Sequence, residues 1–196
     1  MATLTEPSDE ALVRLALLQP HSNAFEQLIK RHQSRLRLYL RSLTGNQAVA
    51  DELAQESLLK VHRALSQFKF QSSFKTWLMR IARNTFLDHV RVASHAADFQ
   101  CASDDCSLNA LETQTLQSSE RQHLLAIDID RSLQWLNTAE REVIAHCYFA
   151  DLSMEETSQL LGMPIGTVKT HSQRGLKKLR EALSAWQTSF EGKVSK

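Results

Sequence analysis

Residues 153–178 read SMEETSQLLGMPIGTVKTHSQRGLKK, and their spacing predicts two helices joined by a tight turn. Ser153, followed three residues later by Glu156, forms a capping box that fixes a helix start. Gly162 stands where a left-handed helix end is expected, and the chain then turns before a second helix begins at Thr167. This order, a short helix, a turn at a glycine and a second helix, has the spacing of a helix-turn-helix.

The second helix of this motif has a basic and amide face. Val168 is expected to pack back on the first helix, which leaves the opposite face free. Hydroxyl, amide and guanidinium groups suit base edges, and lysines neutralise phosphates. A basic surface helix without a DNA role is the alternative explanation. The candidate duplex-DNA residues are Thr167, Lys169, Thr170, Gln173, Arg174, Lys177 and Lys178.

Outside this motif, charge is divided unevenly along the chain, although the net charge is only +1. Residues 1–23 carry −2, residues 24–94 carry +7, residues 95–130 carry −6 and residues 131–196 carry +2. Two positive blocks therefore flank an acidic connector. Such blocks suit a protein that binds a polyanion, and solvated helix faces are the alternative reading of the same charges.

Apolar residues recur at intervals of three and four along most of the chain, which predicts helices and no strand. In the first half, we expect a helix from Ser8 to Gln19, a second ending at Gly45, a third over 47–66 and a fourth beginning after Ser73. Together their apolar stripes form one helical bundle. In the second half, helices are expected over 128–136, 139–149, 154–161 and 167–184.

Between these groups, residues 94–119 are small, polar and acidic, as in a solvated linker. The predicted fold class is therefore all-α, with two small helical domains joined by a flexible acidic linker. The expected divisions are a short N-terminal helix or extension over 1–21, a first domain over 22–94, a linker over 95–125, a second domain over 126–186 and a frayed tail over 187–196.

Composition limits the class of protein. The chain has 196 residues, of which 42% are hydrophobic, and this suffices for cores without disulfides. No apolar run approaches the ~20 residues of a membrane span, and the first ten residues lack the order of a signal peptide. We expect a cytoplasmic protein with no membrane insertion, no cofactor and no metal. A redox or metal sensor at His95, Cys101 and Cys106 is the alternative reading of the linker.

Two surfaces of the first domain carry outward-facing residues that helix packing does not require. The face of the third helix opposite its core stripe aligns acids and amides around one leucine, which favours a protein partner over simple solvation. The fourth helix carries an outward stripe of Thr76, Arg80, Arg83, Leu87 and Arg91, and the aromatic segment 68–74 precedes it. Cations beside aromatic platforms are typical of proteins that hold single-stranded nucleic acid.

Three segments, in this order, resemble the extracytoplasmic-function (ECF, group 4) sigma factors of the sigma-70 family. ADELAQESLLKVHRAL at 50–65 is similar to region 2.1 to 2.2, SFKTWLMRIARNTFLDHVR at 73–91 to regions 2.3 and 2.4, and LSMEETSQLLGMPIGTVKTHSQRGLKKLRE at 152–181 to region 4. Two departures stand out: Asp51-Glu52 replaces the commoner Glu-Asp order, and Thr157-Ser158 replaces the usual Ile-Ala.

The resemblance implies a role for each surface. Core polymerase would be contacted, at the clamp helices of its largest subunit, by Asp51, Glu52, Gln55, Glu56 and Leu59. The minus-ten element would be captured and melted by Phe68, Lys69, Phe70, Ser73, Lys75, Trp77, Arg80, Arg83, Asn84 and Arg91. The minus-thirty-five element would be read as duplex by the second-domain residues given above.

The resemblance also implies partners and a mechanism. The partners would be core RNA polymerase, promoter DNA in duplex and single-stranded form, and an anti-sigma factor, often membrane-bound in this family. Capture of an unstacked base would offset the cost of strand separation for the right base only. The protein itself would have no catalytic residue.

Two other classes fit less well. The TVKTH sequence is also frequent in response regulators, but these carry an α/β receiver and residues 1–94 show no strand-like alternation. An enzyme is disfavoured because no nucleophile and base pair, Gly-rich phosphate loop or paired acidic site stands out.

Overall fold

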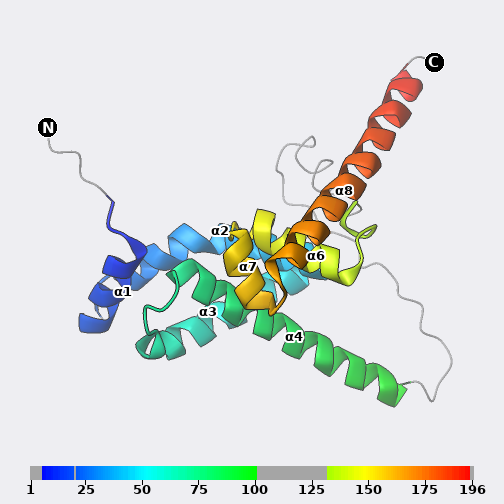
Figure 1. Cartoon of the computed structure of the whole chain (residues 1–196). Helices are drawn as coiled ribbons and strands as arrows, with labels where there is room; N and C mark the ends of the chain where they lie inside the picture. Colours follow the sequence, from blue (N-terminus) through cyan, green and yellow to red (C-terminus); the bar gives the residue numbers. More distant parts are fainter. Residues whose placement is uncertain (1–5, 20, 101–131, 195–196) are drawn as a thin grey trace, which may run out of the picture.

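The computed structural model describes residues 6–19, 21–100 and 132–194, and every regular element in these ranges is helical (Figure 1). We call α1 to α4 the first unit and α6 to α8 the second unit. The elements are α1 (Asp9–Leu18), α2 (Ala24–Thr44), α3 (Gln47–Ala64), the 3-10 turn η1 (Leu65–Gln67), α4 (Phe74–Gln100), α6 (Thr138–Ile144), the π-helical turn η2 (Ala145–Phe149), α7 (Met154–Leu161) and α8 (Ile165–Val194).

Local capping sets the ends of the first helices. The Ser8 hydroxyl accepts the Ala11 N–H at 3.2 Å and starts α1, and the Asn46 side chain starts α3 in the same way. Gly45 ends α2 at φ 65°, a left-handed conformation that costs glycine no steric clash. The predicted start at Ser8 and the predicted end at Gly45 are confirmed.

The predicted apolar stripes of α2, α3 and α4 meet in one core. Its largest fully buried side chains include Tyr39, Leu53, Phe74, Leu78 and Met79. A side chain of this size contributes about 1.5–3 kcal/mol when it is removed from water. The first unit is therefore a helical bundle, as the periodicity predicts.

The fourth helix runs further than the sequence pattern suggests. We expected the regular structure to stop near residue 94, but α4 continues to Gln100. No glycine or proline interrupts residues 74–100, and Ala96 and Ala97 favour helix. The remainder of the expected linker lies outside the described residues.

The second unit contains the expected helix-turn-helix. The Ser153 hydroxyl accepts the Glu156 N–H at 3.1 Å, and the Glu156 carboxylate accepts the Ser153 N–H at 2.9 Å. Gly162 ends α7 at φ 66° in the left-handed region. Val168 on α8 is fully buried. The capping box, the glycine turn and the inward valine are therefore confirmed.

The bounds of the second helix of this motif differ from the prediction. Helix α8 begins at Ile165, two residues before Thr167, because Pro164 disfavours helix before it and not after it. At the other end it runs to Val194, so the expected frayed tail is helical there. Of the expected helix over 128–136, the described residues 132–133 are helical and 134–135 form a turn.

A glycine allows the second unit to close tightly. A Cβ atom placed on Gly175 would lie 2.8 Å from Cγ1 of Ile144, a side chain that is 1% exposed. Helices α6 and α8 can therefore approach at this point only because Gly175 has no side chain.

The two units share one core instead of standing apart. Ala145, Ala150 and Leu152 of the second unit belong to the same buried cluster as the core of α1 to α4. Figure 1 shows η2 and α7 lying over α2 and α4 while the outer part of α8 projects away. Within the described ranges, no helix has the length and hydropathy for a membrane span.

Candidate nucleic-acid interface

The outward face of α3 carries the residues expected to contact a protein partner. Glu52, Gln55 and Glu56 are exposed, and Leu59 in their midst is 58% exposed. Lys60 forms an ion pair with Glu56 at 2.8 Å within the same helix. A leucine left this open among acids and amides is typical of an interaction surface.

Asp51 begins this face beside α2. Arg37 contacts its carboxylate at 3.3 Å, and a shallow hollow next to the pair is lined by Ser34 and Leu38 among others. Leu38 of α2 is 54% exposed and lies outside the apolar stripe that forms the core. Sequence reasoning missed Leu38, although the exposed Ser34 and Arg37 lie on the same side of α2.

The loop before α4 holds its aromatics in two different ways. Phe68 is 6% exposed and packs against Trp77, with ring centroids 5.1 Å apart. Phe70 is partly exposed with φ 56°, and the Arg14 guanidinium lies 4.5 Å from the centroid of its ring. Phe68 therefore supports the loop from the core, while Phe70 and the exposed Lys69 are accessible at its surface.

The expected basic stripe of α4 divides into an open and a covered part. Arg80, Asn84 and Arg91 are exposed. Thr76 had been expected to point outward and is instead 4% exposed. The covered part faces the second unit, because Thr76 contacts Glu156 and Arg83 contacts Glu142.

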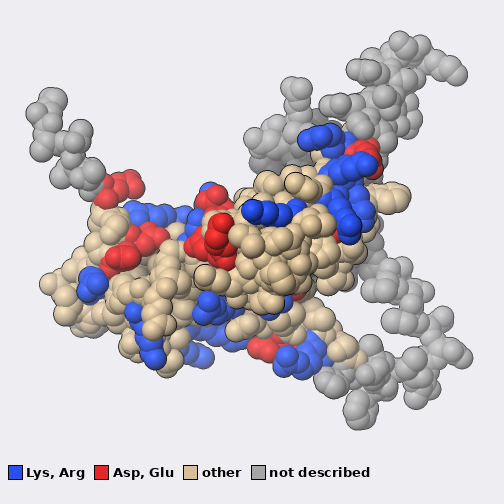
Figure 2. All heavy atoms as spheres, viewed as in Figure 1, with Lys and Arg blue, Asp and Glu red and all other residues tan. Residues whose placement is uncertain are grey.

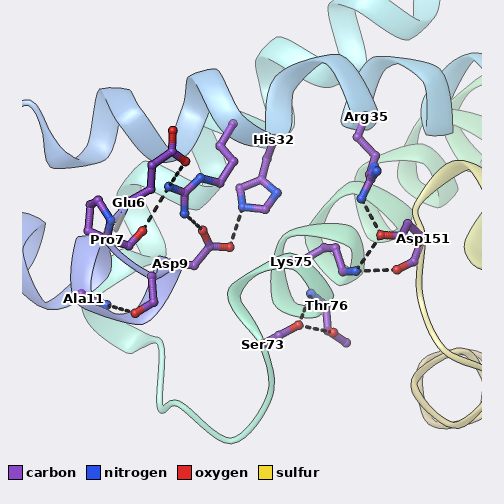
Figure 3. Close-up of polar contacts among 12 residues, drawn as sticks. Glu6, Pro7, Asp9, Ala11, His32, Arg35, Ser73, Lys75, Thr76 and Asp151 are labelled. Carbon is purple, nitrogen blue, oxygen red and sulfur yellow. Dashed lines mark hydrogen bonds and ion pairs between the residues drawn. The ribbon is translucent and has the colours of Figure 1, made fainter. Parts of the chain in front are cut away.

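Acidic groups of the second unit occupy the covered part. Lys75 donates to the Asp151 carboxylate at 3.2 Å and to its main-chain carbonyl at 2.5 Å, and Arg35 of α2 donates to the same carboxylate at 2.6 Å (Figure 3). Arg83 donates to both Glu142 oxygens at 3.2 and 3.3 Å. Lys75 and Arg83 are therefore already paired in this arrangement.

A hydroxyl pair at the start of α4 holds a third carboxylate. Ser73 lies 2.7 Å from the Thr76 hydroxyl, and both donate to Oε1 of Glu156. Burial alone would raise the pKa of Glu156, but the hydrogen bonds from Thr76 and Ser153 hold the pKa below its ordinary value. The pKa of Asp151 is likewise lowered, chiefly by the hydrogen bond and charge of Lys75.

The outer face of α8 presents most of the expected duplex-reading residues. Lys169, Thr170, Gln173, Arg174 and Lys177 are exposed, and Thr167 is partly exposed. Figure 2 shows Lys and Arg side chains gathered along this helix, on the part that projects from the first unit. Cations along one exposed helix face suit the phosphates that flank a major groove.

Lys178 has a different environment from the other lysines of α8. Its ammonium donates to Glu140 at 2.7 Å, and that carboxylate is nearly buried. Burial would raise the pKa of Glu140, but Lys178 and the Asn137 N–H together hold it below its ordinary value. Lys178 thus stabilises the second unit, and its charge is partly neutralised before any phosphate approaches.

Two groups that sequence reasoning missed lie beneath the contact between the units. The Tyr39 hydroxyl is 2.9 Å from Nε2 of His146, and Nδ1 of His146 is 2.6 Å from the Glu142 carbonyl. Burial lowers the pKa of His146 to about 4 and raises that of Tyr39 well above its ordinary value. The neutral imidazole therefore donates to Glu142 and accepts from Tyr39.

The described residues contain no group of three or more His, Cys, Asp or Glu side chains placed to hold a metal ion. Cys101 and Cys106 of the expected sensor lie outside the described residues, as does the side chain of His95. Cys147 is a free thiol whose pKa burial raises.

Every regular element in the described ranges is helical, and the second unit contains a helix-turn-helix, a motif that many DNA-binding proteins share. Family comparison identifies which kind: the model of sigma-70 region 2 matches residues 28–95, and that of sigma-70 region 4 matches residues 132–181. The RNA polymerase sigma factor CarQ of Myxococcus xanthus is 31% identical over 161 residues, covering 82% of this chain and 90% of CarQ. The chain belongs to the ECF sigma factors of the sigma-70 family, which are transcription initiation factors and not enzymes.

Other relatives agree with this assignment. The ECF RNA polymerase sigma factor SigE of Mycolicibacterium smegmatis is 29% identical over 183 residues, covering 91% of this chain and 70% of SigE. The solved structure of CnrH in complex with the cytosolic domain of CnrY has a TM-score of 0.68 at 24% identity and covers 91% of this chain and 99% of that chain. The sigma factor RpoE with the anti-sigma factor NepR, from Bartonella quintana, has a TM-score of 0.66 at 24% identity and covers 83% and 98%. These structures share the fold.

Proposed function

We propose that this chain is a group 4 sigma factor that binds core RNA polymerase through α3, reads a minus-thirty-five element through α8 and captures a minus-ten element with α4 and its preceding loop. The observation that supports this most directly is the exposed row of amide, hydroxyl and cationic side chains on α8, directly after a glycine-ended helix. Cytoplasmic location follows from the proposal, since polymerase and promoter are there.

Duplex reading is assigned to α8. Lys169 and Lys177 are exposed and would neutralise phosphates, which adds affinity without sequence information. Gln173 and Arg174 are adjacent in the chain and both exposed, and an amide suits adenine as a guanidinium suits guanine. Lys178, bound to Glu140, would contribute less than the other lysines.

Strand capture is assigned to the loop and α4. An unstacked base would meet Phe70 and Lys69 at the loop surface, while Arg80, Asn84 and Arg91 would hold the backbone along α4. Phe68 and Trp77 would act by supporting Phe70, because Phe68 is buried and Trp77 packs against it. Favourable capture of one base type would couple reading to melting.

The proposed partners follow from the same surfaces. The acidic and amide face around Leu59 is assigned to the clamp helices of the largest polymerase subunit. CnrH and RpoE were solved with CnrY and with the anti-sigma factor NepR, and we propose that this chain also has an anti-sigma factor. Nothing in the proposal requires a cofactor or a metal.

Arg174→Ala is expected to weaken promoter use by about 1–3 kcal/mol at one minus-thirty-five base pair, because a bidentate contact to guanine would be lost. Promoter variants at each position, transcribed by core polymerase with wild-type or variant protein, measure this loss. Lys177→Ala is the matched control, with a smaller loss that is even across sequences. An even loss for Arg174→Ala would assign it to phosphate alone.

A further inference from the structure

Helix α1 reaches the loop that the proposed function assigns to base capture. The Arg14 guanidinium of α1 lies 4.5 Å from the centroid of the Phe70 ring in that loop. The match to the model of sigma-70 region 2 covers residues 28–95, so α1 (Asp9–Leu18) lies outside it. The contact therefore joins the loop to a helix that the family model does not describe.

Phe70 has an unfavourable main-chain conformation. Its φ of 56° lies in the left-handed region, where the Cβ atom of a bulky residue crowds the main chain. Glycine would adopt this conformation without a steric penalty, so the chain keeps an aromatic ring here in spite of one. Strained residues persist only where surrounding contacts hold them, and they are frequent at functional sites. The contacts that hold Phe70 therefore bear on the function of the loop.

Two neighbours hold the Phe70 ring. Phe68 packs against it with ring centroids 4.8 Å apart and an angle of 56° between the planes, and Phe68 is itself 6% exposed. Arg14 lies over the ring, whose negative face attracts a cation. Phe68 thus supplies apolar packing from the core, and Arg14 supplies an electrostatic attraction from a separate helix.

Helix α1 is firmly attached to the rest of the first unit. Leu12 and Val13 on its inner face are 1% and 0% exposed and belong to the core cluster of that unit. At the start of the helix, a carboxylate oxygen of Asp9 lies 2.7 Å from Nε2 of His32 on α2 (Figure 3). Because α1 is fixed at both points, it can position a loop residue through the single side chain of Arg14.

We propose that Arg14 is a positioning residue for base capture, which holds the Phe70 ring in the orientation that an unstacked base meets. This inference rests on the proposed function of the loop. Fixing the ring before the base arrives reduces the conformational entropy that binding would otherwise remove. Arg14 acts through Phe70 and not by contacting a phosphate, which distinguishes it from Arg80 and Arg91 on α4.

The test measures the affinity of the full chain for a fluorescein-labelled single-stranded oligonucleotide of about twelve mixed-sequence nucleotides. Arg14→Ala is expected to weaken binding about fivefold. Phe70→Leu keeps apolar volume but removes the ring, and is expected to weaken binding about tenfold. The two changes together are expected to cost no more than Phe70→Leu alone, because Arg14 acts only through the ring. Losses that multiply in the double variant would overturn the proposal.

Three further variants separate the cation over the ring from net charge. Arg14→Lys keeps a cation and is expected to bind within about threefold of wild type, whereas Arg14→Gln is expected to resemble Arg14→Ala. Arg63→Ala removes an equal charge from an exposed position on α3. An equal loss for Arg63→Ala would assign the effect to net charge. Tighter binding by Arg14→Ala would show that the guanidinium occupies the place of the base. Either result contradicts a positioning role.

The loop also gives a readout without DNA. Hydrogen exchange at the amides of residues 69–72 is expected to be faster in Arg14→Ala than in wild type, because the strained loop loses one of its two supports. Exchange within α2 serves as the internal reference and is expected to be unchanged. Equal exchange of the loop in both proteins would show that Arg14 does not hold it.

The remaining outcomes also decide. If the wild-type chain does not bind the oligonucleotide measurably, the ring that Arg14 holds does not capture a base and the inference is wrong. Failure of the proposed function is seen separately, because the chain would then not stimulate run-off transcription by core polymerase, whatever the affinities of the Arg14 variants for the oligonucleotide.

Discussion

Gln55→Ala combined with Glu56→Ala is expected to abolish co-purification of the protein with core RNA polymerase. Both side chains are exposed on α3 beside Leu59, so they are free for a partner and not required by the fold. Truncating one member of a hydrogen-bonded charge pair at an interface costs about 2–5 kcal/mol, and 2 kcal/mol is about thirtyfold in dissociation constant. Fluorescence titration of labelled protein with core enzyme measures the change.

Helix α2 offers a matched control. Glu26 and Gln27 are an exposed acid and amide, and Glu26 pairs with Lys30 at 2.7 Å as Glu56 pairs with Lys60 at 2.8 Å. Glu26→Ala with Gln27→Ala therefore removes the same groups and an equivalent ion pair, worth about 0.3–0.5 kcal/mol. Equal polymerase binding by the two double variants would remove α3 from the proposed interface.

Acid is expected to destabilise the protein through His146 before the carboxylates titrate. Burial lowers the pKa of His146 from its ordinary 6.5 to about 4, so between these values the unfolded chain binds the extra proton. The contribution to the free energy of unfolding is fully present above pH 6.5 and is lost as the pH falls. At about 1.4 kcal/mol per pH unit, the loss reaches about 3 kcal/mol near pH 4.

The groups that face His146 support a lowered pKa for this residue. The Tyr39 hydroxyl from α2 supplies no charge, Arg83 from α4 lowers the pKa further, and the Glu142 carbonyl on α6 raises it less than burial lowers it. Burial also lowers the pKa of His32, which therefore adds to the loss in the same direction.

Urea titrations at pH 7, 6 and 5, for wild type and His146→Gln, isolate the imidazole. Glutamine keeps a hydrogen-bonding side chain without a titrating ring. We expect the wild-type free energy of unfolding to fall more steeply than that of the variant over this range. Parallel curves for the two proteins would show that His146 is not the responsible group.

The parts of the fold predicted well are those set by neighbours in the sequence. Capping by Ser8 and Ser153, and the left-handed ends at Gly45 and Gly162, each depend on a few adjacent residues. Helix length was predicted less well: α4 and α8 continue into segments whose polar composition resembles linker or tail. Polarity indicates exposure and does not by itself end a helix: the end of α4 contains no glycine or proline, and α8 continues past Gly192.

The candidate site shows the same limit. The open residues of α3 and α8 follow from helical periodicity within one element, whereas Thr76, Lys75 and Arg83 are covered by partners 59 to 80 residues away in the chain. Summed charges of +7 and +2 for the two blocks predict repulsion between them. Only the fold brings Asp151, Glu142 and Glu156 onto that particular patch of cations.

Run-off transcription of a genomic fragment library by core RNA polymerase, with and without this protein, tests the central claim most directly. We predict a defined set of transcripts that appear only with the protein present, whose start sites share upstream sequences at minus-ten and minus-thirty-five. The same transcripts, or none, in both reactions would contradict the claim that this chain gives polymerase its choice of promoter.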